Sequence, residues 1–338
     1  MRLTELIEPG QQGHSRCQVC QWRCELDVGQ LGRCQMRQAT PAGIEVLNDG
    51  LISAAQFVPI EELRLWHFFP DTSALAVGGW GYAFPADQQR GLYGEIPTDE
   101  AKRRRLEPER AAHVALERLS RGVVWSFSDP SVSLEYVTDL LKASRATSRY
   151  TALVTPGYAT IAALDLFGRY LDGLSLELRA FDDGAYRRLT GVDDWRGVLE
   201  FAAHARNAWN CHIEVTTRLH PNVNDHPEQI QAAGAWLRET LGAHTPWHIL
   251  PGDAGAAAAG AARARAGWPT RPAGCMHGPE PDQHTRCHQC HAVLIERNSS
   301  GGRVVILTTA CAASAAPTRT CGSRSSSAST NGRRWSQR

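Results

Sequence analysis

Short apolar runs alternate with longer amphipathic stretches through the middle of the chain, from about residue 50 to residue 250. The runs are rich in Val, Leu and Ile, which favour strands, whereas the stretches between them repeat apolar residues at the spacing of a helix face. The predicted strands are 74–77, 123–127, 152–154, 174–178, 212–216 and 247–250. The predicted helices are 109–119, 133–143, 160–170, 195–208 and 227–241.

This alternation predicts parallel strands joined by crossover helices. The expected fold class is α/β, a partial or complete TIM-like (β/α) barrel with a cysteine-rich N-terminal metal-binding segment. Composition divides the chain into that segment at 1–48, the barrel at 49–251, an Ala-rich segment with half a zinc knuckle at 252–298, and a tail at 299–338. The tail buries too little apolar surface to offset its ordering entropy, so we expect it to be disordered.

The charge balance argues against partners that recognise proteins by bulk electrostatics. The formal net charge is +1 at pH 7, which predicts no nucleic-acid or membrane partner. The start of the chain lacks the apolar region of a secretory signal, and no run approaches the roughly 18 apolar residues of a membrane span. We therefore expect a cytoplasmic protein, in which ten cysteines are better explained by metal ligation than by disulfides.

Four cysteines near the N-terminus have the spacing of a metal site. Cys17, Cys20, Cys24 and Cys34 follow C-x2-C-x3-C-x9-C. Four thiolates so close in sequence can close tetrahedrally on zinc or hold an iron-sulfur cluster, and the spacing alone leaves both open. Cys287 and Cys290 form a C-x2-C pair, which is half of a zinc knuckle and a second candidate metal site. Cys211 precedes a predicted strand and is expected to be an ordinary core residue.

A series of short motifs in a fixed order resembles one known family. The motifs are the N-terminal cysteine block and residues 59–61, 65–70, 126–130, 154–158, 176–181, 214–217 and 245–248. Through them the chain is similar to the radical SAM superfamily, in particular to pyruvate formate-lyase activating enzyme-like proteins and to the AmmeMemoRadiSam system radical SAM enzyme. Proteins of this family bind a [4Fe-4S] cluster through three cysteines spaced C-x3-C-x2-C and cleave S-adenosylmethionine reductively.

The three cluster positions carry no cysteine in this chain. Carried over by spacing, they fall on Gly79, Ala83 and Ala86, none of which can ligate iron. The resemblance implies S-adenosylmethionine as a ligand, but the catalytic [4Fe-4S] cluster is not expected, and without a cluster no electron reaches the sulfonium. A zinc ion or an iron-sulfur cluster is expected at the N-terminal cysteines instead.

The resemblance also assigns a ligand site at the mouth of the barrel. Ser128 and Asp129 stand where the family has Asn and Glu, and Arg179 stands where it has Lys. Asp129 and Arg179 can grip a zwitterionic ligand there, or they can form a structural ion pair.

The expected function is that of a metal-binding barrel without radical chemistry, which holds a small molecule or a partner protein in its mouth. The alternative is an active S-adenosylmethionine-dependent iron-sulfur oxidoreductase or activase with an unusual cluster site. Whether the protein is an enzyme stays open at this point.

Overall fold

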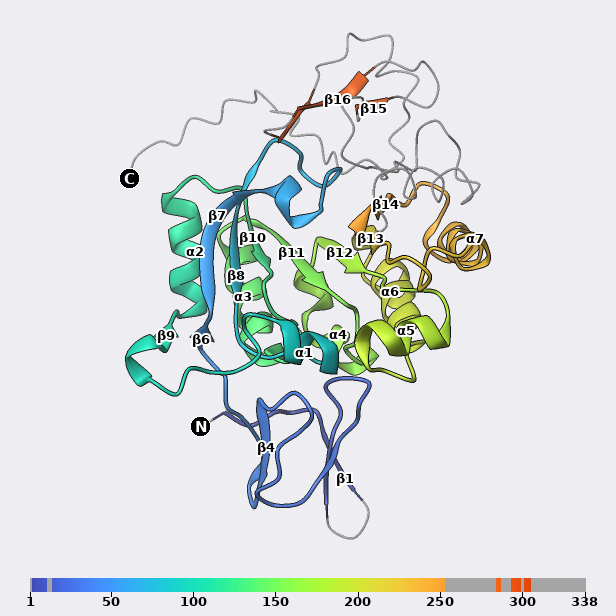
Figure 1. Cartoon of the computed structure of the whole chain (residues 1–338). Coiled ribbons are helices and arrows are strands. Elements are labelled where there is room, and N and C mark those ends of the chain that lie inside the picture. Colours follow the sequence, from blue (N-terminus) through green and yellow to red (C-terminus); the bar gives the residue numbers. More distant parts are fainter. Residues whose placement is uncertain (1, 11–13, 253–283, 287–292, 299–300, 305–338) are drawn as a thin grey trace, which may run out of the picture.

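A seven-stranded sheet forms the centre of the computed structural model, which describes residues 2–10, 14–252, 284–286, 293–298 and 301–304 (Figure 1). The strand order is β14-β13-β12-β11-β10-β8-β7. Six of these strands, β8, β10, β11, β12, β13 and β14, pair in parallel, and β7 is antiparallel to β8. The bounds are β7 Ala54–Pro59, β8 Ser73–Gly78, β10 Gly122–Trp125, β11 Tyr150–Thr155, β12 Gly173–Glu177, β13 His212–Arg218 and β14 Trp247–Leu250.

Every predicted strand and helix of the middle region is present in the structure. Each predicted strand coincides with one of the six parallel strands, and helices cross from one to the next as expected. Two further helices, α1 and α5, were not predicted. The helices are α1 Pro85–Arg90, α2 Pro108–Glu117, α3 Leu134–Ala146, α4 Ile161–Phe167 with η4 Gly168–Tyr170, α5 Asp183–Thr190, α6 Gly197–Asn207, and α7 Pro227–Trp236 with the π-helical turn η5 Leu237–Leu241.

Both faces of the sheet are buried. Large side chains such as Leu75, Val123 and Leu174 point into the core beneath the helices. The opposite face carries Ala74, Ala76, Val124, Tyr150 and Ala152, and the segment between β7 and β8, which includes η2 Ile60–Leu63, packs against it through Leu65 and Phe68. Among the described residues no hydrogen bonds join the two edge strands β7 and β14, so the sheet is open. The structure therefore supports a mixed α/β fold, and it does not show a complete barrel.

The cysteine-rich N-terminal segment lies beneath the sheet, next to α1 (Figure 1). A buried ion pair fixes it to the rest of the molecule, because the Arg37 guanidinium donates to both carboxylate oxygens of Glu135 on α3, at 2.9 and 2.7 Å. The segment is built from short antiparallel pairs. They are β1 Ile7–Pro9, β2 Ser15–Cys17, β3 Glu25–Leu26, β4 Arg37–Thr40 and β5 Gly43–Val46, followed by β6 Leu51–Ile52, which pairs with β9 Arg104–Arg105 near η3 Glu100–Lys102.

The C-terminal quarter is described only in part. Three antiparallel strands are present, β15 Thr285–Arg286, β16 Val293–Asn298 and β17 Gly301–Val304. Strand β17 lies at the start of the tail predicted to be disordered, so that prediction is wrong for Gly301–Val304, where pairing with β16 orders the chain. The rest of that tail, most of the predicted Ala-rich segment, and Cys287 and Cys290 lie outside the described residues. The proposed domain boundaries stay predictions.

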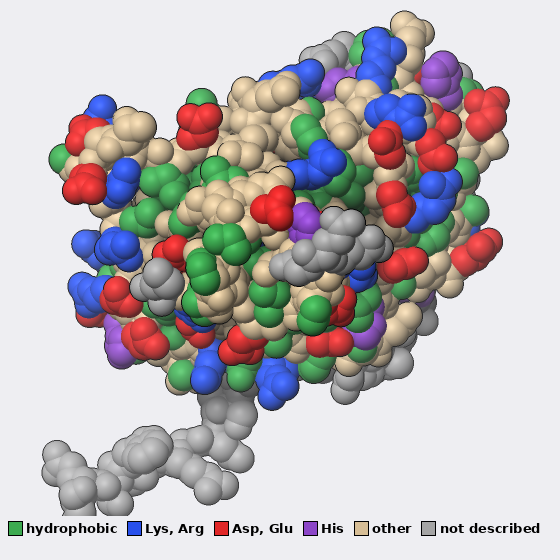
Figure 2. All heavy atoms as spheres, turned by 90° about the horizontal axis from the view of Figure 1, so that it is seen from below, with side chains coloured by type: hydrophobic (Ala, Val, Ile, Leu, Met, Phe, Trp, Pro, Cys, Tyr) green, Lys and Arg blue, Asp and Glu red, His purple; other side chains and the backbone are tan. Residues whose placement is uncertain are grey.

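Two general expectations about the surface can be compared with the structure. No helix of the described part is both long enough and apolar enough to cross a membrane. On the face seen from below, acidic and basic side chains intermingle over the whole surface (Figure 2). This mixture agrees with a formal net charge near zero.

Candidate functional site

A cavity of about 250 Å³ lies at the carboxyl ends of β10, β11 and β12, where ligands of parallel α/β proteins usually bind. All three residues that the resemblance assigned to a ligand, Ser128, Asp129 and Arg179, line this cavity. They come from the segment after β10 and the segment after β12. The strands β10 and β12 flank β11 in the sheet, and parallel strands finish at one edge, so the three residues that the resemblance assigned lie at the same edge.

Asp129 places a carboxylate at the wall of this mouth cavity. The residue is 2% exposed, and its Oδ1 accepts hydrogen bonds from the Ser131 amide at 2.9 Å and the Ser131 hydroxyl at 2.7 Å. Its Oδ2 is buried and has no hydrogen-bond partner among the described residues. Burial raises the pKa of Asp129, against the lowering effect of Ser131 and of the Ala83 backbone. A cationic group in the cavity would satisfy Oδ2 and favour the charged carboxylate.

Arg179 faces the same cavity but does not pair with Asp129 among the described residues. Its Nη2 contacts Asp87 of α1 and Glu177 of β12, each at 2.9 Å. Its Nε is buried without a hydrogen-bond partner. Asp129 and Arg179 thus both line the cavity, and each has one buried polar atom without a hydrogen-bond partner among the described residues, an acceptor on Asp129 and a donor on Arg179. The structural ion pair, which was the alternative interpretation of Arg179, is therefore formed with other partners.

Ser128 supports the loop after β8. Its hydroxyl accepts a hydrogen bond from the Gly79 amide at 3.0 Å, and its carbonyl accepts one from the Trp125 indole at 3.1 Å. The preceding residue, Phe127, has φ = 66°, a left-handed conformation that is costly for a side chain of this kind. The Tyr82 hydroxyl donates to the Phe127 carbonyl at 2.9 Å and helps to hold this conformation.

The loop that would hold the catalytic cluster is filled by protein atoms. A Cβ built on Gly79 would lie 2.9 Å from Ser133 Oγ and 3.0 Å from the Trp125 ring, so no side chain fits there without displacing both neighbours. Ala83 is buried, and its carbonyl accepts a hydrogen bond from the Trp22 indole at 2.7 Å. Ala86 is half-buried in the first turn of α1. These residues offer no ligand for iron, and they do not fit a [4Fe-4S] cluster.

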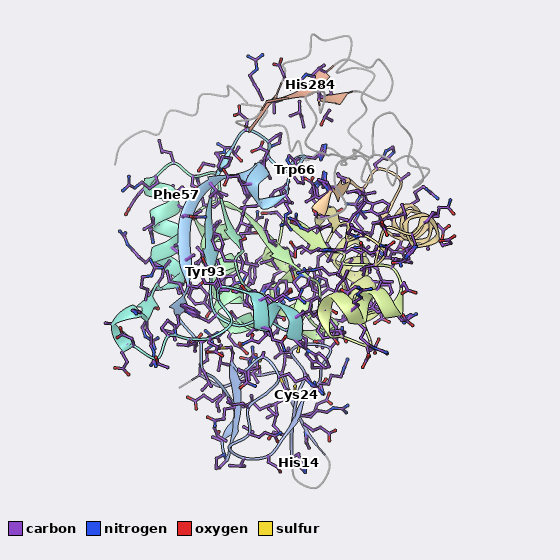
Figure 3. All side chains as sticks on the ribbon, in the orientation of Figure 1. His14, Cys24, Phe57, Trp66, Tyr93 and His284 are labelled. Atoms are coloured by element: carbon purple, nitrogen blue, oxygen red, sulfur yellow. The ribbon has the colours of Figure 1, made fainter. Side chains whose placement is uncertain are left out.

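The four N-terminal cysteines gather close to this loop. Cys24 lies in the segment beneath the sheet (Figure 3), and a Cβ built on Gly32 would lie 3.9 Å from the sulfurs of both Cys24 and Cys34. Burial raises the pKa of the Cys34 thiol to about 11 and also raises the pKa of Cys17 and Cys20. All four thiols are free. The donor types suit zinc or an iron-sulfur cluster, which would have to stabilise the thiolates that burial disfavours, but no three of the four sulfurs lie within 4.8 Å of one another in the described residues.

A buried cluster on β13 and β14 was not anticipated from the sequence. The Glu214 carboxylate lies 3.0 Å from His67 Nδ1, 2.7 Å from His248 Nε2 and 3.1 Å from His212 Nε2, and it accepts hydrogen bonds from the amides of Trp66 and His67. Burial opposes its charge, yet the charge of His67 and the hydrogen bonds from three histidines hold the pKa of Glu214 well below its usual range.

This histidine-glutamate cluster has the ligand types of a metal site, and it also holds a loop in place. His67, Glu214 and His248 form the one group of three or more possible metal ligands in the described residues whose ligand atoms all lie within 4.8 Å. The same contacts fasten the loop at Trp66, which lies at the end of the sheet away from the cysteines (Figure 3). The alternation of side chains along a strand, which puts His212 and Glu214 on one face, was the signal that could have found it.

Comparisons with known proteins find proteins that are similar to the chain over part of its length. No protein-family model matches the chain. An uncharacterised protein of Methanocaldococcus jannaschii is 26% identical over 236 residues, 69% of each chain. The isethionate sulfite-lyase activating enzyme of Oleidesulfovibrio alaskensis is 26% identical over 135 residues, 40% of this chain and 42% of that protein.

Solved structures with some similarity carry related names. A domain of a pyruvate-formate lyase-activating enzyme from Bacteroides vulgatus has a TM-score of 0.39 at 17% identity, covering 43% of this chain and 92% of that one. A radical SAM methyltransferase from Sphaerobacter thermophilus has a TM-score of 0.46 at 15% identity, covering 66% and 71%. Both TM-scores lie below 0.5, so the similarity to either structure is weak.

Proposed function

We propose that this protein is a radical-SAM-type barrel, similar to the pyruvate formate-lyase activating enzymes, that binds a small zwitterionic ligand at its mouth and does not carry out radical chemistry. The two unsatisfied polar atoms at the mouth, Asp129 Oδ2 and Arg179 Nε, are the observation that carries the proposal. Buried polar groups are rarely left unpaired in native proteins, so a ligand that pairs both accounts for their retention.

The chemistry of the two groups specifies the ligand. The Asp129 carboxylate can accept hydrogen bonds from an ammonium group. The Arg179 guanidinium can donate to a carboxylate, and its orientation is fixed by the contacts of its Nη2 with Asp87 and Glu177. An amino acid moiety carries both groups. S-adenosylmethionine, which the sequence resemblance implies, is therefore the first candidate, and a peptide terminus of a partner protein, which carries only one of the two groups, is a poorer match.

The proposed loss of radical chemistry rests on the loop after β8. A Cβ built on Gly79 would lie 2.9 Å from Ser133 Oγ and 3.0 Å from the Trp125 ring, which disfavours a cysteine at this position. The N-terminal cysteines are the remaining place for a metal, and we propose that they hold zinc or an iron-sulfur cluster. A bound metal there would cross-link a segment too small to supply a core of its own.

Isothermal titration calorimetry with S-adenosylmethionine tests the ligand. We expect Asp129→Asn and Arg179→Met each to weaken binding about tenfold or more, since each removes a charge-assisted hydrogen bond. Arg187→Met on the exposed side of α5 is the control and should bind as the wild type does. No binding by the wild-type protein, or equal losses in all three variants, would contradict the proposal.

A second assay tests the absence of radical chemistry. The protein is reconstituted anaerobically with iron and sulfide, reduced with dithionite and supplied with S-adenosylmethionine. We expect no 5′-deoxyadenosine, and we expect metal binding that is lost when Cys17, Cys20, Cys24 and Cys34 are replaced by Ala. Catalytic formation of 5′-deoxyadenosine would establish the alternative, an active enzyme with an unusual cluster site.

A further inference from the structure

A second and larger cavity opens at the other end of the same strands. It encloses about 740 Å³, which lies in the usual range for small-molecule sites. Its lining residues precede β10, β11, β12 and β13, whereas the mouth cavity is lined by residues that follow β10, β11 and β12. The two cavities are therefore about one strand length apart, roughly 13–20 Å for strands of four to six residues.

The lining of this second cavity is strongly basic. Five arginines contribute to it, and Asp172 is its one acidic residue. The local charge is thus far more positive than the formal net charge of +1 for the whole chain. A concave site lined by one sign of charge concentrates the field and attracts ions of the opposite sign. The arginines are Arg121, Arg145, Arg149, Arg169 and Arg206.

Much of this positive charge is not neutralised by acidic side chains of the described residues. Arg145 is neutralised by Asp172, which it contacts at 2.9 and 2.7 Å. Arg149 donates to the Ser120 carbonyl at 2.6 Å and keeps its full charge. The side chains of Arg121 and Arg169 form neither hydrogen bonds nor ion pairs among the described residues, so their donors face solvent and the cavity.

Placement in the fold explains some of these arginines but not all of them. Arg145 and Arg206 lie in the last turns of α3 and α6, where a cation is stabilised by the helix dipole. Arg149 precedes β11 and donates through its Nε to the carbonyl of Thr147, the C-cap of α3, at 3.2 Å, whereas Arg121 precedes β10 directly and its side chain makes no such contact among the described residues. Their convergence on one cavity brings together guanidinium groups that repel one another, which an anionic ligand would offset.

Aromatic rings form the remaining wall of this basic cavity. Phe69 and Tyr150 stack at a centroid distance of 4.7 Å with an interplanar angle of 13°, and Trp209 lines the other side. The Trp209 indole nitrogen donates to Asp165 at 2.9 Å, which fixes the ring. Rigid aromatic surfaces beside guanidinium groups suit a ligand that combines anionic oxygens with a flat or apolar part.

We propose that the basic cavity binds a small phosphorylated molecule, independently of the ligand at the mouth. Guanidinium groups recognise phosphate oxygens through paired hydrogen bonds, and several of them around one cavity favour a ligand with more than one negative charge. A polymer such as a nucleic acid is a poorer match, because acidic and basic side chains elsewhere are balanced and offer no extended track of positive charge.

Isothermal titration calorimetry of the full-length protein tests this site, with inorganic pyrophosphate as the probe and sulfate at equal ionic strength as the comparison anion. We expect tighter binding of pyrophosphate than of sulfate and a loss of affinity as salt is raised. Arg121→Glu should weaken pyrophosphate binding by about tenfold or more, and Arg121→Lys by less, because lysine keeps the charge but not the paired donors. Arg121 is exposed and its side chain is unpaired among the described residues, so both variants should fold.

Two control variants show whether a loss of binding belongs to this cavity. Arg188→Glu makes the same charge change on the exposed side of α5, outside both cavities, and should leave pyrophosphate binding unchanged. Asp129→Asn should also leave it unchanged, since it acts on the mouth. The proposal is overturned if the wild type binds pyrophosphate no better than sulfate, if Arg188→Glu is as harmful as Arg121→Glu, or if Asp129→Asn alters the affinity.

Discussion

Replacing Gly79 by Ala should destabilise the fold, because the space beside this residue is already occupied. The new methyl group would meet Ser133 Oγ at 2.9 Å and two carbons of the Trp125 ring at 3.0 and 3.1 Å. Neither neighbour can withdraw freely: Trp125 is fully buried with its indole bonded to the Ser128 carbonyl, and Ser133 Oγ accepts a hydrogen bond from Asn48 at 3.0 Å.

The magnitude follows from two opposing effects. Inserting a methyl group into a filled core typically costs about 1–3 kcal/mol, and the stiffer unfolded chain of an alanine variant returns about 0.4–1 kcal/mol. We therefore expect a net loss of about 1–2 kcal/mol in the free energy of unfolding. Gly79→Cys, which restores the thiol expected from the family, should cost more because it adds a sulfur beyond the methyl position.

Urea unfolding followed by tryptophan fluorescence measures this loss, provided that the m-value stays unchanged. Gly184→Ala, at an exposed position near the start of α5, is the matched control and should be neutral or slightly stabilising. Gly79→Ala combined with Trp125→Phe should cost less than the sum of the two single changes, since the smaller ring relieves the clash. An alanine variant as stable as the wild type would show that the cluster position is not filled, and the structural case against a cluster would fail.

Three further predictions concern the other buried groups. Glu214→Gln should lower the free energy of unfolding by about 3–5 kcal/mol at pH 7, because it leaves charged or polar histidines without their anion. Since the pKa of Glu214 is held well below its usual value, its contribution is present above about pH 4.5 and is lost as the pH falls, so the unfolding curves of the wild type and of the Glu214→Gln variant should converge in acid. Cys34→Ala should reduce the metal content measured by mass spectrometry and lower the melting temperature, whereas Cys211→Ala should leave the metal content unchanged. Arg37→Met should lower the free energy of unfolding, measured in urea, by about 3–5 kcal/mol, because it leaves the Glu135 carboxylate buried without a partner. Adding Glu135→Leu should recover most of that loss; if it does not, the ion pair itself stabilises the fold beyond the cost of burying its two charges.

Sequence periodicity predicted the central sheet well and the peripheral helices poorly. Strands buried on both faces must be apolar throughout, so their runs stand out from the helices between them. Helix α5 was missed because it buries only Ala185, Tyr186 and Thr190 and is otherwise charged or polar. Helix α1 was missed because it begins at Pro85 and buries no residue, which leaves no apolar face to detect.

The positions of the candidate site residues could be predicted from the sequence, but their contacts with distant parts of the chain could not. Asp129 and Arg179 could be placed at one mouth because the resemblance put both after strands of one parallel sheet, and parallel strands end at the same edge. Their actual partners could not be foreseen: Asp87 reaches Arg179 from a helix 92 residues earlier in the chain. The contact between His67 and Glu214 spans 147 residues, and its geometry depends on how the loop between β7 and β8 folds back over the sheet.

The contact between Trp22 and the Ala83 carbonyl has a thermodynamic consequence. It ties the cysteine segment to the stretch of backbone that borders the mouth, and a Cβ built on Gly81 from that stretch would lie 2.6 Å from Met36 Cγ. A metal at the proposed cysteine site would also order this stretch, and the affinities for the proposed ligand and for the metal would then be reciprocally coupled, each raising the other by the same factor. Removing the metal would then weaken ligand binding at the mouth, although the metal would not contact the ligand.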